Sequence, residues 1–113
     1  MYFARLEDLT AELNSHSQGL KKVFIRNEDT DSNLTQLAFG SMQEGESSGL
    51  HTHPTMDEYF YFLKGQGLFV IENDRYDLEP SSFVRVPSGH RHELKCTGVE
   101  GLEFVYFGVS TGF

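Results

Sequence analysis

Four of the five histidines lie in two short groups, His51-Thr52-His53 and His90-Arg91-His92. Alternate side chains of an extended strand share one face, so His51 and His53 point the same way and can bind the same ion. Glu58 stands at the start of a strongly apolar segment, where an unpaired carboxylate is costly to bury. A metal ion would offset that cost, and so would an arginine, a lysine or a hydrogen-bond network.

His92 follows a rigid turn, Pro87-Ser88-Gly89, at the start of another apolar segment. Three imidazoles and one carboxylate suit a borderline divalent cation such as Mn, Fe, Co, Ni, Cu or Zn. Magnesium and calcium prefer shells made of oxygen alone, so this set of side chains does not suit them. The chemistry indicated by these residue types is therefore that of a transition-metal site.

The elements that must position these side chains are mostly strands, because short apolar runs alternate with glycines and aromatic residues are plentiful (10 Phe and 5 Tyr). Lys64-Gly65-Gln66-Gly67 separates two such runs and predicts a hairpin. Many short strands at this spacing predict an antiparallel sandwich or barrel. The expected strands are 23–26, 34–39, 58–63, 68–72, 83–86, 93–96 and 102–109.

The N-terminal stretch, about residues 1–20, is the one segment that predicts a helix. Leu6, Leu9 and Leu13 recur at helical spacing, and Gly19 follows the expected end of this helical extension. His16 falls in a polar run within this stretch, and we expect it on the surface.

Length and charge exclude several classes of protein. A chain of 113 residues predicts one domain, residues 1–113. A formal charge of −8 argues against nucleic acid and against anionic membrane surfaces as partners. No apolar run approaches the ~20 residues of a membrane-spanning helix. One cysteine and an N-terminus that is charged early, without an apolar core, predict a cytoplasmic protein.

Two spaced motifs in the chain resemble those of the cupin family. The first motif reads Gly45, His51, His53, Glu58 and Gly65, with every family spacing met. The second matches at three positions, and departs from the family pattern at two others where that pattern has glycine and asparagine. The three matching positions are Pro87, Gly89 and His92, and the two departures are Ser81 and Cys96.

This resemblance covers roughly residues 35–108 and implies an all-β fold, the small double-stranded β-barrel, or jelly roll, of the cupins. It also implies one metal ion inside the barrel, of which the identity stays open among Zn, Mn, Fe, Ni and Co. The ligands would be His51, His53, Glu58 and His92, with water or substrate at the other positions. The alternative is a barrel of the same geometry that stays empty, with hydrogen-bonded histidines.

Three further residues have both a structural and a functional interpretation. His90 is expected to be an exposed loop histidine, and the alternative makes it a catalytic proton carrier beside the metal. Cys96 is expected to be a small buried thiol, with a redox or ligand role as the alternative. Arg85 is expected to face the surface rather than to bind an anion inside. Phe60 and Phe62 share a face with Glu58 and are expected in the core.

A cation with four protein ligands leaves up to two coordination positions open, which suits bidentate binding of a hydroxy-carbonyl, an enediol or a dicarboxylate. The leading hypothesis is a metal-dependent enzyme on a small oxygenated metabolite, with sugar isomerisation or epimerisation and dioxygenation as the two chemistries. A non-catalytic module that binds or senses a small molecule, for example a carbohydrate, is the alternative, and a structural role comes third. Cupins cover all these classes, so the fold does not choose among them.

We expect a homodimer, because an open antiparallel sheet has edges that must be covered or charged. The segments 23–26 and 102–109 are the candidates for the joint.

Overall fold

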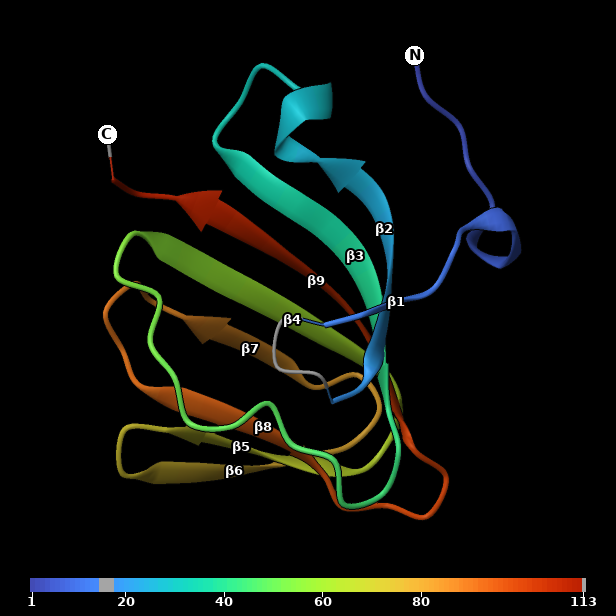
Figure 1. The fold of residues 1–113 in the computed structure, drawn as a ribbon. Coiled ribbons are helices and arrows are strands. Elements are labelled where there is room, and N and C mark those ends of the chain that lie inside the picture. Colours follow the sequence, from blue (N-terminus) through green and yellow to red (C-terminus); the bar gives the residue numbers. More distant parts are fainter. Residues whose placement is uncertain (15–17, 113) are drawn as a thin grey trace.

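The computed structural model describes residues 1–14 and 18–112, which form an antiparallel β-structure with two single-turn 3-10 segments (Figure 1). His16 lies outside the described residues. The elements in chain order are η1 (Leu6–Asp8), β1 (Glu12–Leu13), β2 (Leu20–Arg26), η2 (Asn27–Asp29), β3 (Leu34–Met42), β4 (Met56–Gly65), β5 (Gly67–Ile71), β6 (Asp74–Leu78), β7 (Phe83–Val86), β8 (His92–Cys96) and β9 (Leu102–Ser110).

Two sheets form two layers. The larger sheet has six strands in the order β1-β2-β3-β9-β4-β7, and the smaller has three in the order β6-β5-β8. The longest ladders join β3 and β4 to β9, which places the last strand of the chain in the middle of the larger sheet. In Figure 1 the β5, β6 and β8 layer lies below the β4 and β7 end of the larger sheet.

The sheets do not close into a barrel, which corrects the closed double-stranded β-barrel expected from the sequence. The connection from β3 to β4 runs beside β8 but pairs with it only at two isolated bridges, Ser47 with Lys95 and His51 with His92. Gly49, at φ +73°, and Pro54, which lacks a backbone donor, both interrupt this connection. A continuous ladder cannot form there, so the architecture is an open β-sandwich.

The prediction of an N-terminal helix is also wrong. The structure has only the 3-10 turn Leu6–Asp8 in this region, followed by β1, in which Glu12 and Leu13 pair with Lys21 and Leu20 of β2. A helix this short gains little from its own hydrogen bonds, whereas pairing with the edge of β2 satisfies backbone groups of both strands.

The core lies between the two layers and is rich in phenylalanine. Phe60 and Phe62 of β4 point into it and are 6% and 0% exposed, while Tyr61 between them is 45% exposed. The alternation predicted for this strand is thereby confirmed. Phe69 of the smaller sheet is fully buried against them, with its ring centroid 5.1 Å from that of Phe60. These rings hold the two layers together beneath the histidines.

Gly65 ends β4 in a conformation that only glycine adopts readily. Its φ is +90°, and a Cβ atom built there would lie 1.8 Å from the carbonyl oxygen of Gly101. Both the turn into β5 and the close approach of the β8–β9 connection therefore require a residue without a side chain.

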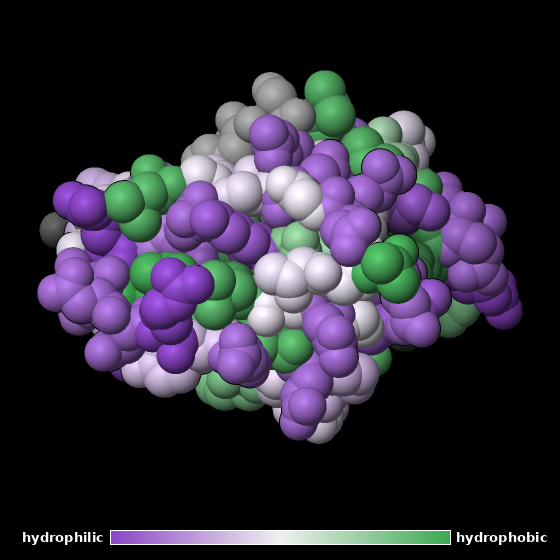
Figure 2. Space-filling view, turned by 90° about the horizontal axis from the view of Figure 1, so that it is seen from below, coloured by the Kyte–Doolittle hydropathy of each residue, from purple (hydrophilic) through white to green (hydrophobic). Residues whose placement is uncertain are grey.

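The surface agrees with the charge of the chain. Figure 2, which views the molecule from below, shows mostly hydrophilic side chains with small hydrophobic groups between them. None of the helical segments in the described residues has the length and apolar character that crossing a bilayer requires.

Candidate metal centre

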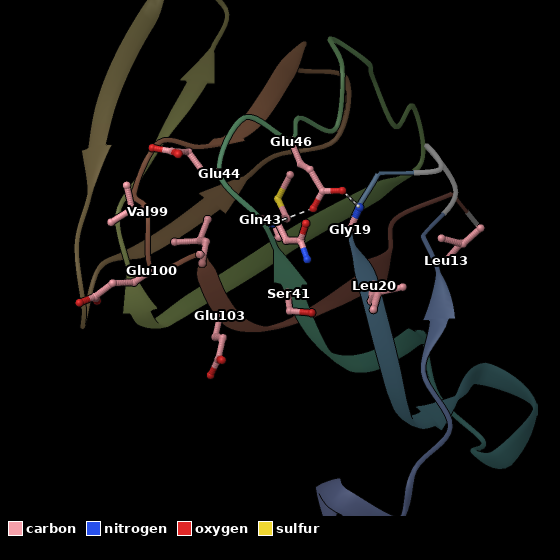
Figure 3. A pocket seen from close by; sticks show the side chains of 13 residues that line it. Leu13, Gly19, Leu20, Ser41, Gln43, Glu44, Glu46, Val99, Glu100 and Glu103 are labelled. Atoms are coloured by element: carbon pink, nitrogen blue, oxygen red, sulfur yellow. Dashed lines mark hydrogen bonds between the residues drawn. The ribbon is translucent and has the colours of Figure 1, made fainter.

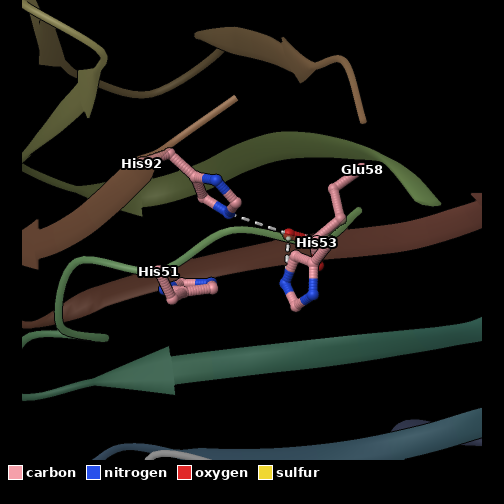
Figure 4. A group of neighbouring side chains, drawn as sticks. All are labelled: His51, His53, Glu58 and His92. Carbon is pink, nitrogen blue, oxygen red and sulfur yellow. Dashed lines mark hydrogen bonds and ion pairs between the residues drawn. The ribbon is translucent and has the colours of Figure 1, made fainter. Parts of the chain in front are cut away.

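The four predicted ligands converge on one point between the layers (Figure 4). One nitrogen or oxygen atom from each of His51, His53, Glu58 and His92 can be chosen so that all four lie within 4.8 Å of one another. Glu58 and His92 are buried, and His51 and His53 are half-buried. The site therefore has a closed inner side and a partly open outer side.

The side chains come from three pieces of the fold, with His51 and His53 both in the β3–β4 connection, and backbone hydrogen bonds hold these pieces together. Glu58 lies near the start of β4 and His92 begins β8. The backbones of His51 and His92 exchange two hydrogen bonds, of 3.0 and 2.9 Å. The backbone N–H of Gly89, in the turn before β8, donates to the carbonyl of His53 at 2.8 Å.

Two of the imidazoles are oriented by backbone carbonyls. Nδ1 of His92 lies 2.9 Å from the carbonyl oxygen of His90, and Nδ1 of His51 lies 2.8 Å from that of Gly49. A carbonyl only accepts hydrogen bonds, so each Nδ1 must carry a hydrogen. The lone pair of a neutral ring is then on Nε2. This arrangement is typical of metal-binding histidines, whose second nitrogen is fixed by a hydrogen bond.

Glu58 is the electrostatic centre of the group. Its Oε1 lies 3.2 Å from Nε2 of His92 and 3.3 Å from Nε2 of His53. Burial raises the pKa of Glu58, but the hydrogen bonds and charges of the two imidazoles outweigh it and bring the pKa to about 2. The hydrogen bond to Glu58 in turn raises the pKa of His53 above its ordinary value, against a smaller opposing effect of burial.

These contacts fit a divalent cation. Nδ1 of His92 holds its hydrogen on a carbonyl, so Nε2 of the neutral ring presents a lone pair to a carboxylate oxygen 3.2 Å away. Two electron pairs at that distance repel unless a proton or a cation lies between them. Within the described part of the chain, the ion-pair partners of Glu58 are His53 and His92, not a lysine or arginine. The donor set, three imidazoles and one carboxylate, is one that transition metals accept.

A cavity of about 140 Å³ opens beside the four side chains. One wall is formed by the metal-binding group, and the body of the cavity is apolar. Its apolar lining consists of Met42, Met56, Phe60, Phe69, Leu94 and Phe104. The volume admits only a small molecule.

Three polar side chains line the same cavity from β2, β3 and β9: Lys21, Gln36 and Tyr106. The ammonium of Lys21 donates to Oε1 of Gln36 at 3.2 Å, and Gln36 also hydrogen-bonds to Tyr106. Burial, together with the charges of Glu58 and Glu12, raises the pKa of Tyr106 to about 12. Its hydroxyl therefore keeps its hydrogen at neutral pH.

None of these three residues was predicted from the sequence to belong to the site. The strand predicted in this region begins at Val23, so Lys21 lay outside any predicted element. The signal was nevertheless present, because Lys21 has the strand parity of Val23. In the same way Tyr106 has the parity of the buried Phe104.

His90, the predicted catalytic residue, is exposed on the loop before β8 and is not among the residues that line the cavity. Its Nδ1 lies 3.3 Å from the carbonyl oxygen of Ser88. A catalytic role for His90 stays a prediction.

Cys96 is buried in the core, where burial raises the pKa of its thiol, and Arg85 faces solvent, as expected from the sequence. Arg85 binds Asp57 at 2.9 Å, and the other oxygen of Asp57 accepts the backbone N–H of Ser88 at 2.7 Å. This carboxylate, adjacent to Glu58, thereby ties the turn before His92 to β4.

A larger and more open groove, of about 760 Å³, lies where the β3–β4 and β8–β9 connections meet β1 and β2 (Figure 3). Its acidic side chains are Glu44, Glu46, Glu100 and Glu103. The carboxylate of Glu46 accepts the backbone N–H groups of Gly19 and Gln43, at 3.2 and 2.7 Å, so it has a structural role. We find no converging ligand group among the described residues of this groove.

The chain belongs to the cupin family. Residues 38–108 match the family's cupin domain, a range that contains all four converging side chains.

Two curated relatives agree with this assignment. An oxalate-binding protein of Thermotoga maritima is 26% identical over 106 residues, which are 89% of this chain and 88% of that protein. An uncharacterised protein of Methanocaldococcus jannaschii is 27% identical over 62 residues, and the match spans 55% of this chain and only 50% of that protein.

Solved structures share the fold. The crystal structure of a predicted oxalate decarboxylase from Thermotoga maritima has a TM-score of 0.88 at 23% identity, and covers 96% of this chain and 98% of its own. A structure of Bacillus subtilis oxalate decarboxylase, a protein with Mn(II) centres, has a TM-score of 0.77 at 20% identity, and covers 97% of this chain and 29% of its own.

Proposed function

We propose that this cupin binds one divalent transition metal through His51, His53, Glu58 and His92, and that the bound metal holds a small oxygenated metabolite in the adjacent cavity. One observation carries the proposal. The Nε2 atoms of two histidines lie 3.2 and 3.3 Å from the same buried carboxylate oxygen, in the absence of any described lysine or arginine partner. A divalent cation can accept electron pairs from both imidazoles and from the carboxylate, so it would hold this arrangement without a proton on either ring.

The relatives support both parts of the proposal. The oxalate-binding protein of Thermotoga maritima is named for a small dicarboxylate, and the oxalate decarboxylase of Bacillus subtilis has Mn(II) centres. Manganese is therefore the first to test of the ions left open by the sequence, Zn, Mn, Fe, Ni and Co, and oxalate is the first ligand to try.

The metal would supply Lewis acidity toward a ligand oxygen. The side chains and backbone of the protein would balance the charge of the metal, orient its ligands and shape the cavity. Glu58 brings a negative charge that partly offsets that of the cation, and the carbonyls of Gly49 and His90 fix the rings of His51 and His92. The phenylalanines and methionines give the cavity an apolar lining, and its volume of about 140 Å³ favours a small ligand.

Binding without catalysis is the role that the cavity supports best, ahead of the isomerase expected from the sequence. Isomerisation needs a base that reaches the substrate. Tyr106 lines the cavity, but its pKa of about 12 makes it a hydrogen-bond donor rather than a base, and His90 is not part of the lining. Dioxygenation needs no such base, so it is the enzymatic alternative that we retain.

Reconstitution of the metal-free protein tests these roles. We would load it with Mn(II), Fe(II), Co(II), Ni(II) or Zn(II), measure the bound metal by elemental analysis, and titrate oxalate by calorimetry. We expect about one metal per chain and metal-dependent binding of the ligand. A folded His51→Ala/His53→Ala variant that keeps the occupancy of the wild type would contradict the site. Oxygen consumption by the Fe(II)-loaded protein, and by none of the other metal-loaded forms, would establish the enzymatic alternative, dioxygenation.

We further propose that the chain forms a homodimer through the outer face of the larger sheet. Tyr61 of β4 and its register partner Phe83 of β7 are 45% and 61% exposed, and Leu63 beside them is 45% exposed. Large exposed side chains grouped on one face of a sheet favour a second copy of the chain as the partner, since that copy offers an identical apolar surface.

A further inference from the structure

Lys21 introduces a positive charge into a cavity whose other described lining, apart from the metal-binding group, consists of apolar and uncharged polar side chains. It lies on β2 opposite Gly40, in the larger sheet, whereas His92 belongs to the smaller sheet. Both residues line the same cavity of about 140 Å³. The cavity therefore has two positions at which negative charge is favourable, the metal-binding group and Lys21.

The ammonium of Lys21 has no ion-pair partner among the described residues. Its hydrogen-bond acceptor is the neutral amide oxygen of Gln36, at 3.2 Å. Glu12 is its register partner across β1 and β2, but the carboxylate of Glu12 binds Arg26 at 2.8 Å.

Gln36 fixes the position of the Lys21 ammonium group. Its Oε1 accepts from Lys21, and the same side chain hydrogen-bonds to Tyr106, which is stacked on Phe60 with ring centroids 5.6 Å apart. The long lysine side chain thus loses freedom before any ligand arrives, which lowers the entropic cost of binding. The three residues form a polar end of the cavity supported by the core.

The charges in the cavity define the ligand class. Lys21 and Glu58 are the charged residues of its described lining, the histidines being neutral as ligands. They cancel each other, so a bound divalent cation leaves the cavity with two positive charges in excess. Hydroxy-carbonyls and enediols are neutral or singly charged, and do not balance this excess. A small dicarboxylate dianion does.

We propose that Lys21, held by Gln36, is the specificity-determining residue that makes this cavity select a small dicarboxylate over neutral ligands with the same chelating oxygens. This inference rests on the proposed metal-dependent binding of an oxygenated metabolite and names its ligand class. Lys21 would act on the ligand and not on the metal, so metal affinity and ligand preference should separate experimentally.

Three small bidentate probes carry different charges: oxalate, glycolate and glycolamide have two, one and no negative charges at neutral pH. We would titrate each by calorimetry into Mn(II)-loaded wild type, Lys21→Met, Lys21→Arg and Lys22→Met. Lys22 is the matched control, because it lies on the same strand and its ammonium donates to the carbonyl of Leu6 outside the cavity. Elemental analysis after each titration checks that oxalate has not removed the metal.

We expect wild type to bind in the order oxalate, glycolate, glycolamide. Lys21→Met should weaken oxalate binding about tenfold or more, as the loss of a charge-assisted hydrogen bond does. Its affinity for glycolamide and for Mn(II) should stay within about twofold, whereas Lys21→Arg should retain most of the oxalate affinity, and Lys22→Met should match wild type. Higher salt should weaken oxalate binding more in wild type than in Lys21→Met.

Two results would overturn the inference alone: equal losses for oxalate and glycolamide in Lys21→Met, or a metal-loaded wild type that prefers glycolamide. Metal-loaded wild type that binds none of the probes would also reject it, while leaving the metal site in place. A wild type that retains no metal would reject the proposed function together with the inference.

Discussion

The role of Glu58 is tested most sharply by the Glu58→Gln variant, because glutamine keeps the size of the side chain and removes its charge. The oxygen within 3.3 Å of both His53 and His92 would become part of a neutral amide. Carboxylates are common ligands of transition metals, whereas amides bind them weakly. We therefore expect the fold to persist and the affinity for metal to fall.

The size of the effect follows from binding linkage. A metal at 100 times its Kd stabilises the folded state by about 2.7 kcal/mol. A chain of 113 residues has an unfolding entropy of roughly 0.24 kcal/mol per degree, so this stabilisation raises the Tm by about 11 °C. If Glu58→Gln weakens binding about 100-fold, the same metal concentration gives only about 0.4 kcal/mol, or roughly 2 °C.

Thermal melts of wild type and Glu58→Gln, with and without metal, measure this difference. Glu103→Gln is the control, since Glu103 is a carboxylate of β9 that does not line the metal-site cavity. It should show the full shift of the wild type. A shift of equal size in wild type and Glu58→Gln would refute the reasoning and remove Glu58 from the site.

The remaining predictions concern pH, association and backbone geometry. In the metal-free protein Glu58 raises the pKa of His53 above its ordinary 6.5, so protons should compete with metal below that raised pKa; an affinity for metal that stays constant from pH 8 to 5 would contradict this. Phe83→Lys should lower the mass measured by light scattering from dimer to monomer, while Tyr76→Lys, on the smaller sheet, should leave the dimer intact; a wild type of about 13 kDa at all concentrations rejects the dimer. Gly65→Ala should destabilise the fold by more than about 2 kcal/mol in urea melts, because its Cβ would clash with a backbone oxygen; an unchanged midpoint would mean that the turn can move aside.

The residues of the candidate site could be predicted from the sequence because their types and their spacing within short segments are visible there. The parity of Glu58 with Phe60 depends only on the two-residue period of a strand, whereas His51 and His53, predicted to alternate in the same way, lie in the β3–β4 connection and still reach the same site. The structure places all four predicted ligands together, and the strand over 83–86 has the predicted bounds. Where side-chain chemistry and local period agree, sequence reasoning is sufficient.

The rest of the fold depends on contacts that the sequence does not display. β6 is exposed along most of its length and has no apolar alternation, so its strand conformation comes from pairing with β5. The leucines of the N-terminal segment suggested a helix, but the open edge of β2 recruits Glu12 and Leu13 into a strand. Barrel closure likewise depended on whether the β3–β4 connection pairs continuously with β8, and the presence of Gly49 and Pro54 in the sequence does not by itself tell which contacts form there.

Ser81 illustrates a departure from the family pattern that the structure explains. It stands where the family pattern has glycine, and its φ of +74° lies in the left-handed region that glycine adopts without strain. Its backbone N–H donates to the carbonyl of Phe62 at 2.8 Å, which helps to hold the turn before β7 despite that strain.

The division of the ligands between the two sheets has a mechanical consequence. Glu58 belongs to the six-stranded sheet and His92 to the three-stranded sheet, 34 residues further along the chain. A shared cation would be a reversible cross-link between the two layers, which no β-ladder among the described residues joins, whereas the packed phenylalanine rings of the core are present with or without metal. Loading with metal should therefore slow amide hydrogen exchange most at the starts of β4 and β8, and much less around Phe62 and Phe69. The end of the β-sandwich at which β4 and β8 begin would then be rigid or mobile according to the concentration of available metal.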